Sequence, residues 1–320
     1  MCTAINFNLS RHLFSRTLDL ECSYGECVVC TPRHYRLHYR HESSQSKHYA
    51  IIGVGRVVDN VPLYYDAFNE AGLAAAALNF PANAVYFEKK PQLINVASYE
   101  LITFILSHCS NLSEAVALLY KINITNDSFN SELPSTPLHW IIADKSGAIT
   151  VESVSGGVEI YENPFGVMTN SPEFSYHLLR VSDFMKLDSV QPENKICPTV
   201  NLSYYSGGIG AIGLPGDFSS TSRFIRAVFL KNHSVCEEVS HAFDIMENLS
   251  VPKGAVVTED GKPFMTVYTS VADAEGRVYY FTTAPSRRIR AVSMNDAIMN
   301  SDVLSTFEMN EEEKILYINE

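Results

Sequence analysis

Several features that mark whole classes of protein are missing from this sequence. It has no run of about 20 apolar residues, the length that a membrane-spanning helix needs. Its first residues lack the basic start and continuous apolar stretch of a secretion signal, because Ile5, Phe7 and Leu9 alternate with polar neighbours as in a strand. Internal repeats and low-complexity tracts are also missing. We therefore expect a globular protein of the cytoplasm with no membrane partner.

Positive charge is scarce. The chain has 24 Lys and Arg against 36 Asp and Glu, which gives a formal net charge of -12. A surface that reads nucleic-acid phosphates needs clustered Lys and Arg. The densest basic runs, 33–41 and 287–290, lie in strand-like or loop-like contexts and read as solvated faces. Nucleic acid is therefore not an expected partner.

Neither a metal site nor a cofactor site is indicated. The seven cysteines are an odd number in a chain without a visible secretion signal, which favours reduced thiols. Cys22, Cys27 and Cys30 lack a second Cys or His pair at ligand spacing. The segment 208–213 matches the dinucleotide fingerprint in form, but Leu214-Pro215-Gly216 follows where a helix would have to run. We expect a glycine-lined loop there instead.

The chain of 320 residues is long enough for one large domain, and no break in composition divides it, so we expect a single domain over 1–320. Two blocks of predicted strands alternate with two blocks of predicted helices, which indicates an α+β sandwich with two sheets between helices. Strands are expected at 3–9, 13–20, 28–31, 49–57, 74–80, 138–144, 148–153, 158–162, 166–169, 264–273 and 278–283, a turn at 66–73, and a polar loop at 123–137. Helices are expected at 98–108, 114–120, 174–187, 219–230 and 235–247.

The N-terminus is the most informative stretch. Methionine aminopeptidases remove Met1 when the second residue is small, and Cys2 is small. The mature chain then begins with a thiol, of pKa about 8.5, beside an α-amine of pKa about 7.7–8.0, so the amine can accept the thiol's proton. Nucleophile and general base then belong to one residue. The alternative is that Cys2 is an arbitrary second residue.

Arg16 and Asp19 follow in the next predicted strand. Their odd spacing places them on opposite faces of an ideal strand, so a bend near Thr17 is needed if both are to reach the N-terminus. Without such a bend they are an ordinary surface pair.

Together these residues resemble the choloylglycine hydrolase family, which contains bile salt hydrolases and penicillin V acylases among the N-terminal nucleophile hydrolases. The resemblance extends over the whole chain and is carried by these motifs: Met1-Cys2-Thr3, Arg16-x-x-Asp19, Asn69-Glu70-x-Gly72-Leu73, Leu78-Asn79-Phe80-Pro81, Leu138-His139-Trp140, Thr169-Asn170-Ser171-Pro172, Leu214-Pro215-Gly216-Asp217 and Ser222-Arg223-Phe224. It implies a four-layer αββα sandwich of two antiparallel sheets, and a homotetramer.

The resemblance also implies roles for the matched positions. Cys2 is the nucleophile, Arg16 is the cation beside it, and Asp19 holds the α-amine. Asn170 and the backbone amide of Asn79 form the oxyanion hole, whose donors are each worth roughly 10²–10³ in rate. Arg223 is a second arginine near the nucleophile. Taken without the family, Asn79 and Asn170 read as strand-end turn residues and Arg223 as a surface arginine.

Asn79 favours the bile-salt branch of the family, because the penicillin acylase branch tends to carry Tyr there. A steroid needs an apolar pocket, which five loop or strand-end residues could line; ordinary packing under loops is the alternative for each. These residues are Leu18, Tyr24, Val58, Phe129 and Leu133. The leading hypothesis is hydrolysis of the amide that joins a bile acid to glycine or taurine. The alternatives are a penicillin V or acyl-homoserine-lactone acylase with the same machinery, and a non-catalytic binding protein on the same scaffold.

Overall fold

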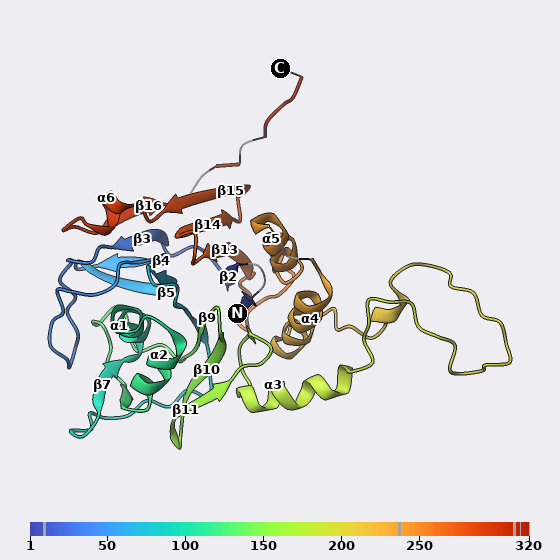
Figure 1. The fold of residues 1–320 in the computed structure, drawn as a ribbon, viewed down its shortest axis with the longest axis horizontal. Coiled ribbons are helices and arrows are strands. Elements are labelled where there is room, and N and C mark those ends of the chain that lie inside the picture. Colours follow the sequence, from blue (N-terminus) through green and yellow to red (C-terminus); the bar gives the residue numbers. More distant parts are fainter. Residues whose placement is uncertain (9–10, 236–237, 310–311, 314, 320) are drawn as a thin grey trace.

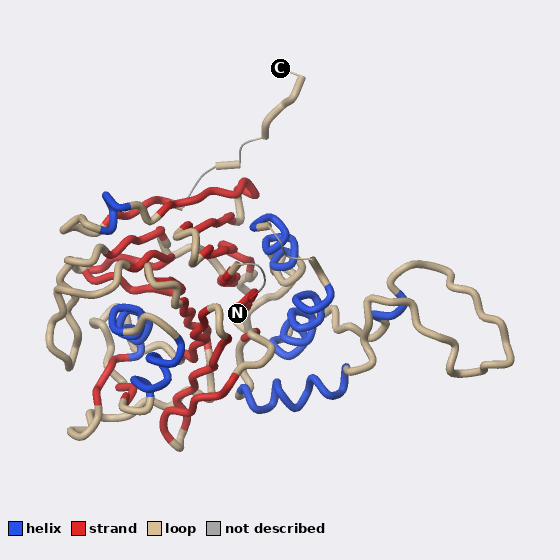
Figure 2. Tube along the Cα trace, viewed as in Figure 1, coloured by secondary structure: helices blue, strands red, loops and turns tan. Residues whose placement is uncertain are grey.

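The structure, a computed structural model, describes residues 1–8, 11–235, 238–309, 312–313 and 315–319. Two β-sheets face each other at its centre, and helices cover the outer face of each (Figure 1). Figure 2 shows that the strands form the inner layers and that most helices lie outside them. The α+β fold with four αββα layers, expected from the sequence, is therefore confirmed.

The six-stranded sheet contains the N-terminus. Its order is β12-β1-β2-β13-β14-β15, and each neighbouring pair is antiparallel. Its strands are β1 Cys2–Asn8, β2 His12–Leu20, β12 Val167–Met168, β13 Met265–Asp273, β14 Val278–Thr283 and β15 Ser286–Ser293.

The eight-stranded sheet has the order β11-β10-β9-β6-β5-β4-β3-β16 and is also antiparallel. Its strands are β3 Cys27–Thr31, β4 Ile51–Val58, β5 Val61–Asn69, β6 Ala74–Asn79, β9 Leu138–Asp144, β10 Gly147–Val154, β11 Gly157–Glu162 and β16 Ser305–Glu308. A separate parallel pair joins β7 Ile94–Ala97 to β8 Ile122–Thr125.

The helices divide between the two outer faces. Side chains of α1 and α2 pack on the eight-stranded sheet, and those of α3, α4 and α5 pack on the six-stranded sheet. The helices are α1 Leu101–His108, α2 Leu112–Leu119, α3 Phe174–Arg180, α4 Ser220–His233, α5 Val239–Glu247 and the short α6 Asp296–Met299. Asn111 and Ser219 cap α2 and α4 by accepting a backbone N–H in the first turn. In the part of the chain that is described, no helix is both long and apolar enough to cross a membrane.

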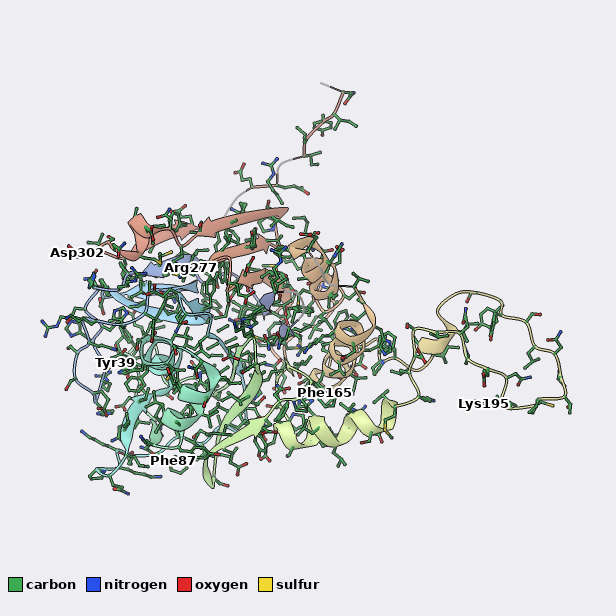
Figure 3. All side chains as sticks on the ribbon, viewed as in Figure 1. Tyr39, Phe87, Phe165, Lys195, Arg277 and Asp302 are labelled. Carbon is green, nitrogen blue, oxygen red and sulfur yellow. The ribbon has the colours of Figure 1, made fainter. Side chains whose placement is uncertain are left out.

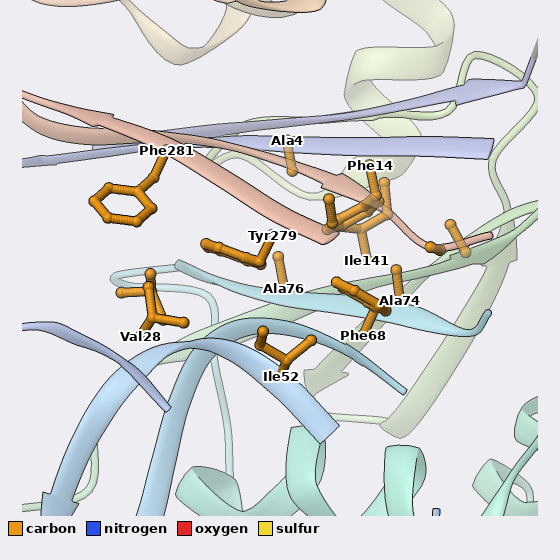
Figure 4. Close-up of a cluster of buried hydrophobic side chains, with 14 of the residues drawn as sticks. Ala4, Phe14, Val28, Ile52, Phe68, Ala74, Ala76, Ile141, Tyr279 and Phe281 are labelled. Atoms are coloured by element: carbon orange, nitrogen blue, oxygen red, sulfur yellow. The ribbon is translucent and has the colours of Figure 1, made fainter. Parts of the chain in front are cut away.

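The layer between the sheets is apolar over most of its area. Figure 4 shows Ala4 and Phe14 of one sheet facing Val28, Ile52, Phe68 and Ala76 of the other. On β6, the small side chains of Ala74 and Ala76 face the layer between the sheets. The alternate residues Ala75 and Ala77 face the helical side or the cavity. The sheets therefore pack closely, and charged groups enter this layer only where the structure supplies partners for them.

Most expected elements are present, and the differences have local causes. The predicted turn at 66–73 is wrong in its first half, because the alternating pattern of β5 continues through Asp66 to Asn69. The expected helix over 174–187 is α3 followed by a 3-10 turn, Val181–Phe184. Strands β5, β7, β8, β15 and β16 were not predicted; β8 occupies the start of the expected polar loop at 123–137. The expected end of the first strand at residue 9 lies outside the described residues.

One segment projects from the body. Residues 188–208 form an irregular arm, marked by Lys195 in Figure 3, which lies away from the layered core. The arm carries exposed apolar side chains, including Ile196, Leu202 and Tyr205. The glycine-rich run 208–213 lies at its base and forms one 3-10 turn, Ile209–Ala211, in place of the helix that a dinucleotide site needs.

Candidate active site

Cys2 is the first residue of β1 and is 3% exposed. It pairs with Leu18 of β2, and its thiol belongs to the layer between the two sheets. Met1 continues this pairing: its ammonium group donates to the Asp19 carbonyl oxygen at 2.7 Å, and its own carbonyl accepts from the Asp19 amide at 2.9 Å. The strand ladder thus fixes where the N-terminal residues lie.

Arg16 lies on the same face of the sheet as the thiol. Its Nη2 donates to Cys2 Sγ at 3.3 Å and to the Ala77 carbonyl at 3.1 Å. Burial disfavours the guanidinium charge, but the neighbouring Tyr268, Cys2 and Asp66 outweigh burial and raise the pKa of Arg16. Arg16 is therefore a fixed cation within hydrogen-bond distance of the Cys2 sulfur.

Asp66 on β5 anchors Arg16, and the sequence analysis did not single it out. Arg16 Nη1 lies 3.3 Å from Asp66 Oδ1 and donates to the Tyr268 hydroxyl at 3.0 Å. The hydroxyls of Tyr268, Tyr279 and Ser270 all donate to the Asp66 carboxylate. A Cβ on the adjacent strand at Gly53 would lie 2.1 Å from the Asp66 carbonyl oxygen, so glycine is needed there. The carboxylate of one sheet thus binds three hydroxyls and a guanidinium of the other.

Asp19 and Arg223 lie on the opposite face of β2 from Arg16. The Thr266 hydroxyl donates to Asp19 Oδ1 at 2.6 Å, while Oδ2 has no hydrogen-bond partner among the described residues. Burial raises the pKa of Asp19, against the lowering effect of Arg223 and the N-terminal ammonium group. Burial also lowers the pKa of Arg223, although Asp19 and Cys2 oppose this. Asp19 and Arg223 thus lie beneath the N-terminus, and the charge of each partly offsets the cost of burying the other.

The predicted bend near Thr17 is wrong. β2 is continuous from His12 to Leu20, and an irregularity occurs instead in its partner β13, between Thr266 and Tyr268. No bend is needed because Cys2 is contacted from both faces of the sheet. Arg16 contacts its thiol, while Arg223 Nη1 donates to its carbonyl oxygen at 2.5 Å.

Asn170 links the N-terminus to the end of β6. Its Oδ1 accepts from the Cys2 amide at 2.8 Å and from Arg223 Nη2 at 2.8 Å. Its Nδ2 donates to the Asn79 carbonyl at 2.8 Å. The backbone of Asn170 is held by the Ser220 hydroxyl, which bonds both its N–H and its C=O, and by His177 Nε2 at 3.0 Å from its carbonyl oxygen. The structure thus brings together five predicted residues, Cys2, Asn79, Asn170, Arg16 and Arg223, with Asp19 next to Met1.

A cavity of about 530 Å³ opens over Cys2. Four of the five residues predicted for the acyl pocket line it, Leu18, Tyr24, Phe129 and Leu133. Val58, at the end of β4, is not among the lining residues; Arg56, two positions earlier on the same strand, is. Other apolar or aromatic lining residues were not predicted, and they are Met1, Leu20, Leu63, Tyr64, Tyr65, Ala77, Tyr99, Pro134, Leu138 and Phe264.

Two loops form the mouth of this cavity. Tyr24 is 46% exposed and lies on the loop after β2, where its hydroxyl donates to Glu21. Phe129 packs edge-on against Tyr99 with ring centroids 5.4 Å apart, and its carbonyl accepts from Arg40 Nη2 at 2.9 Å. The loop residues were predictable as isolated apolar side chains in polar segments. The strand residues were not, because an apolar residue on a strand gives no sign of facing a cavity.

The other cysteines differ from Cys2 in their surroundings. Burial raises the pKa of Cys30 and of Cys109 to about 12. Cys22 is exposed, and Cys236 lies outside the described residues. Where the chain is described, no three His, Cys, Asp or Glu side chains converge as metal ligands do.

The arrangement provides the groups that acyl transfer requires. A buried thiol lies beside a fixed guanidinium at the floor of an apolar cavity, and Asn170 connects the main-chain amide of Cys2 to the main chain of Asn79, which lines the same cavity. A thiolate nucleophile needs a nearby cation, and a tetrahedral oxyanion needs N–H donors.

Comparison with known proteins agrees with this geometry. Residues 2–307 match the model of the family described as linear amide C-N hydrolases, choloylglycine hydrolase family. A bile salt hydrolase/transferase of Lactiplantibacillus plantarum is 39% identical over 324 aligned positions, which cover 100% of both chains. A conjugated bile acid hydrolase of Lactobacillus gasseri is 34% identical, over 96% of this chain and 100% of the relative.

Solved structures agree as well. A mutant conjugated bile acid hydrolase of Clostridium perfringens superimposes with a TM-score of 0.93 at 30% identity, over 100% of both chains. A penicillin V acylase of Agrobacterium tumefaciens shares the fold, with a TM-score of 0.76 at 20% identity over 99% of this chain and 94% of that one. The resemblance indicated by the sequence motifs is confirmed, and the chain belongs to the choloylglycine hydrolase family of linear amide C–N hydrolases.

Proposed function

We propose that this protein hydrolyses the amide bond between a bile acid and its glycine or taurine. The observation that carries the proposal is the position of the Cys2 thiol, which lies 3.3 Å from Arg16 Nη2 at the floor of a cavity of about 530 Å³ with a largely apolar lining. The two relatives named above for bile salts cover 96–100% of this chain at 34–39% identity.

The proposed reaction begins once Met1 has been removed. The freed α-amine of Cys2 takes the thiol proton, and Sγ attacks the amide carbonyl carbon to give a tetrahedral oxyanion. Collapse of this intermediate breaks the C–N bond, and the ammonium of Cys2 returns the proton to the leaving nitrogen. Water, deprotonated by the same amine, then attacks the thioester, releases the bile acid and restores the thiol.

The two asparagines are proposed to stabilise the oxyanion. An amide nitrogen has two N–H donors, and Asn170 Nδ2 uses one of them on the Asn79 carbonyl. The second N–H, together with the backbone N–H of Asn79, is proposed to face the oxyanion. Arg223 and Asp19 are proposed to fix the main chain and the amine of Cys2 from the opposite face of the sheet.

Recognition is proposed to depend mainly on the steroid. The net charge of -12 does not attract an anionic substrate, and Arg16 is already bonded to Asp66 and to the thiol. Burying a few hundred Å² of steroid at about 25 cal/mol per Å² contributes several kcal/mol before ordering costs are subtracted. Leu18, Tyr24, Phe129 and Leu133 are the proposed acyl contacts.

A side-by-side assay with glycocholate, taurocholate and penicillin V tests the proposal. We expect both bile salts to be hydrolysed and penicillin V to be a poor substrate. A kcat/KM for penicillin V equal to or above that for either bile salt would replace the proposal by the acylase alternative. Acyl-homoserine lactones form a fourth arm of the assay with the same criterion. Binding of cholate without turnover of any amide would favour the non-catalytic alternative.

We further propose that the protein forms a homotetramer in the cytoplasm. The arm at 188–208 supports assembly, because exposed apolar side chains on a projecting segment are suited to burial against another copy. Light scattering after size-exclusion chromatography tests the proposed mass. A purely monomeric protein at micromolar concentration would contradict it.

A further inference from the structure

A buried histidine–glutamate pair contacts the neighbours of the two asparagines of the proposed oxyanion site. His139 on β9 has its Nδ1 3.1 Å from Glu152 Oε1 on β10, and its Nε2 3.0 Å from the carbonyl oxygen of Thr169. The two side chains are 2% and 0% exposed. Neither residue lines the cavity over Cys2, so the reaction proposed above gives this pair no direct part.

Both ring nitrogens of His139 face acceptors. A carbonyl oxygen can only accept, so Nε2 must carry a proton in order to bond Thr169. Glu152 also accepts the backbone N–H of Phe174 through both of its oxygens, at 3.1 and 3.2 Å, as a carboxylate does. The contacts are all satisfied when the ring is an imidazolium facing a carboxylate. The same contacts are satisfied when the proton lies on Glu152, so the geometry requires one proton shared between Nδ1 and Oε1.

The pair contacts the neighbours of both asparagines. Thr169, whose carbonyl His139 binds, precedes Asn170, and Phe174, whose N–H Glu152 binds, begins α3 just after it. Phe80, which follows Asn79, stacks flat on the His139 ring, with centroids 4.2 Å apart and planes 7° from parallel. Asn79 ends a strand of the eight-stranded sheet, whereas Asn170 follows β12 of the other sheet. The histidine–glutamate pair is therefore a bridge between the segments that carry the two proposed donors.

We propose that His139 and Glu152 are positioning residues for the oxyanion site, and that their shared proton sets the distance between Asn170 and Asn79. This proposal rests on the proposed function. Alignment of the two donors matters because oxyanion stabilisation depends on donors held at hydrogen-bond distance from the developing charge. The pair acts through Thr169, Phe174 and Phe80 and has no contact with the substrate.

The test is Glu152→Gln, which keeps the shape of the side chain and one acceptor but removes the charge that holds the imidazolium. We expect kcat for glycocholate to fall between roughly 10-fold and 100-fold, with KM changed less than about threefold. The rate at which iodoacetamide labels Cys2 should stay at the wild-type value, because Arg16 and the thiol are untouched. Affinity for the aldehyde analogue of cholic acid, which Cys2 converts to a hemithioacetal, should fall with kcat/KM, while affinity for cholate stays unchanged.

Glu159→Gln is the matched control. Glu159 lies opposite Glu152 in the β10–β11 register but is exposed, so this variant should behave as the wild type in all four measurements. A Glu152→Gln variant with kcat within twofold of the wild type would overturn the proposal. So would a fall in Cys2 labelling that parallels the fall in kcat, since that indicates general damage.

A second variant covers the case in which Glu152→Gln does not fold. The double variant His139→Gln/Glu152→Gln leaves no charge to bury, and a straight-chain amide cannot span Glu152 and Thr169 from opposite sides as the ring does. It should lose kcat with normal Cys2 labelling, and wild-type kcat would overturn the proposal. If the wild type hydrolyses no bile salt, the proposed function fails independently, and the same variants are then compared on the amide that the wild type does cleave.

Discussion

The floor and the mouth of the cavity over Cys2 are built in different ways. At the floor, Cys2, Arg16 and Asp66 lie on paired strands and are at most 3% exposed. At the mouth, Tyr24, Phe129 and Leu133 lie on loops, and Tyr24 is 46% exposed. Strand pairing fixes the floor by registers that cannot shift without moving every side chain to the other face. We infer that the floor governs the chemical step and that the mouth governs affinity, so damage to each should appear in a different kinetic constant.

The strongest test of the floor is removal of the nucleophile. Cys2→Ala should lower kcat on glycocholate on the order of 10⁴-fold or more while the protein stays folded. Cys22→Ala is the matched control and should retain activity, because Cys22 is exposed and lies outside the cavity lining. Intact-mass measurement of the active protein should show that Met1 is missing. A homogeneous active preparation that keeps Met1 would contradict the mechanism.

Labelling the thiols extends this test. Near neutral pH iodoacetamide should leave Cys30 and Cys109 unmodified, because burial raises the pKa of each to about 12. Cys22 should react without loss of activity. Loss of activity should follow labelling of Cys2 alone, as measured by peptide mass mapping.

The second test keeps the positive charge at position 16 but changes the geometry of its hydrogen bonds. Arg16→Lys should lower kcat about 100-fold with little change in KM, because an ammonium group cannot bond Cys2, Ala77, Tyr268 and Asp66 together as the guanidinium does. Arg11→Lys, a surface ion-pair arginine, is the control and should have the wild-type kcat. A variant in which KM alone rises would assign Arg16 to binding and remove the distinction between floor and mouth.

The third test concerns the mouth. Phe129→Asp should raise KM for glycocholate and taurocholate alike by about tenfold, because it places a carboxylate where the steroid is proposed to lie. The kcat should stay within about threefold of the wild type. Phe307→Asp, on the edge strand β16 and 37% exposed, is the control and should leave both constants unchanged. A change confined to one conjugate would show that this loop contacts the amino-acid part.

The smallest effect on activity is expected beneath the floor, at His177, which donates to the Asn170 carbonyl. Burial lowers the pKa of His177 from 6.5 to about 4. Between these values the unfolded chain binds a proton that the folded chain does not, so the free energy of unfolding falls as the pH drops from about 6.5 to about 4.

His177→Gln should remove about 3 kcal/mol of this acid-dependent loss of stability. The measurement is urea unfolding at neutral pH and near pH 4. His233→Gln, at the exposed end of α4, is the control and should keep the wild-type pH dependence. At neutral pH the activity of His177→Gln should change less than about threefold, since glutamine can still donate to Asn170.

The sequence predicted the parts of this structure that depend on local pattern. The 3.6-residue period located α1, and the helices expected at 114–120 and 219–230 correspond to α2 and α4. The residues around Cys2 were found because they belong to motifs of a known family. Their own local patterns would have assigned Asn79 and Asn170 to turns.

The rest depends on contacts between distant segments. Asp66 is bonded by Tyr268 and Tyr279, about 200 positions further along the chain, and local patterns carry no information on such pairing. The sequence feature that could have identified Asp66 is a charged residue inside an alternating apolar strand, where a charge is tolerated only if it is paired. The same signal marks Glu152 on β10, which the sequence analysis also passed over.

The pairing of Met1 with Asp19 has a consequence for the order of events in synthesis. Two main-chain hydrogen bonds pair Met1 with Asp19 at the end of the β1–β2 ladder. A peptidase that acts on the folded chain would first have to break both of them. The nascent N-terminus is free long before β13 is made, because β13 begins at Met265. We therefore expect the proposed removal of Met1 to take place on the ribosome, before the ladder closes, and we expect chain refolded in vitro with Met1 in place to be folded but inactive.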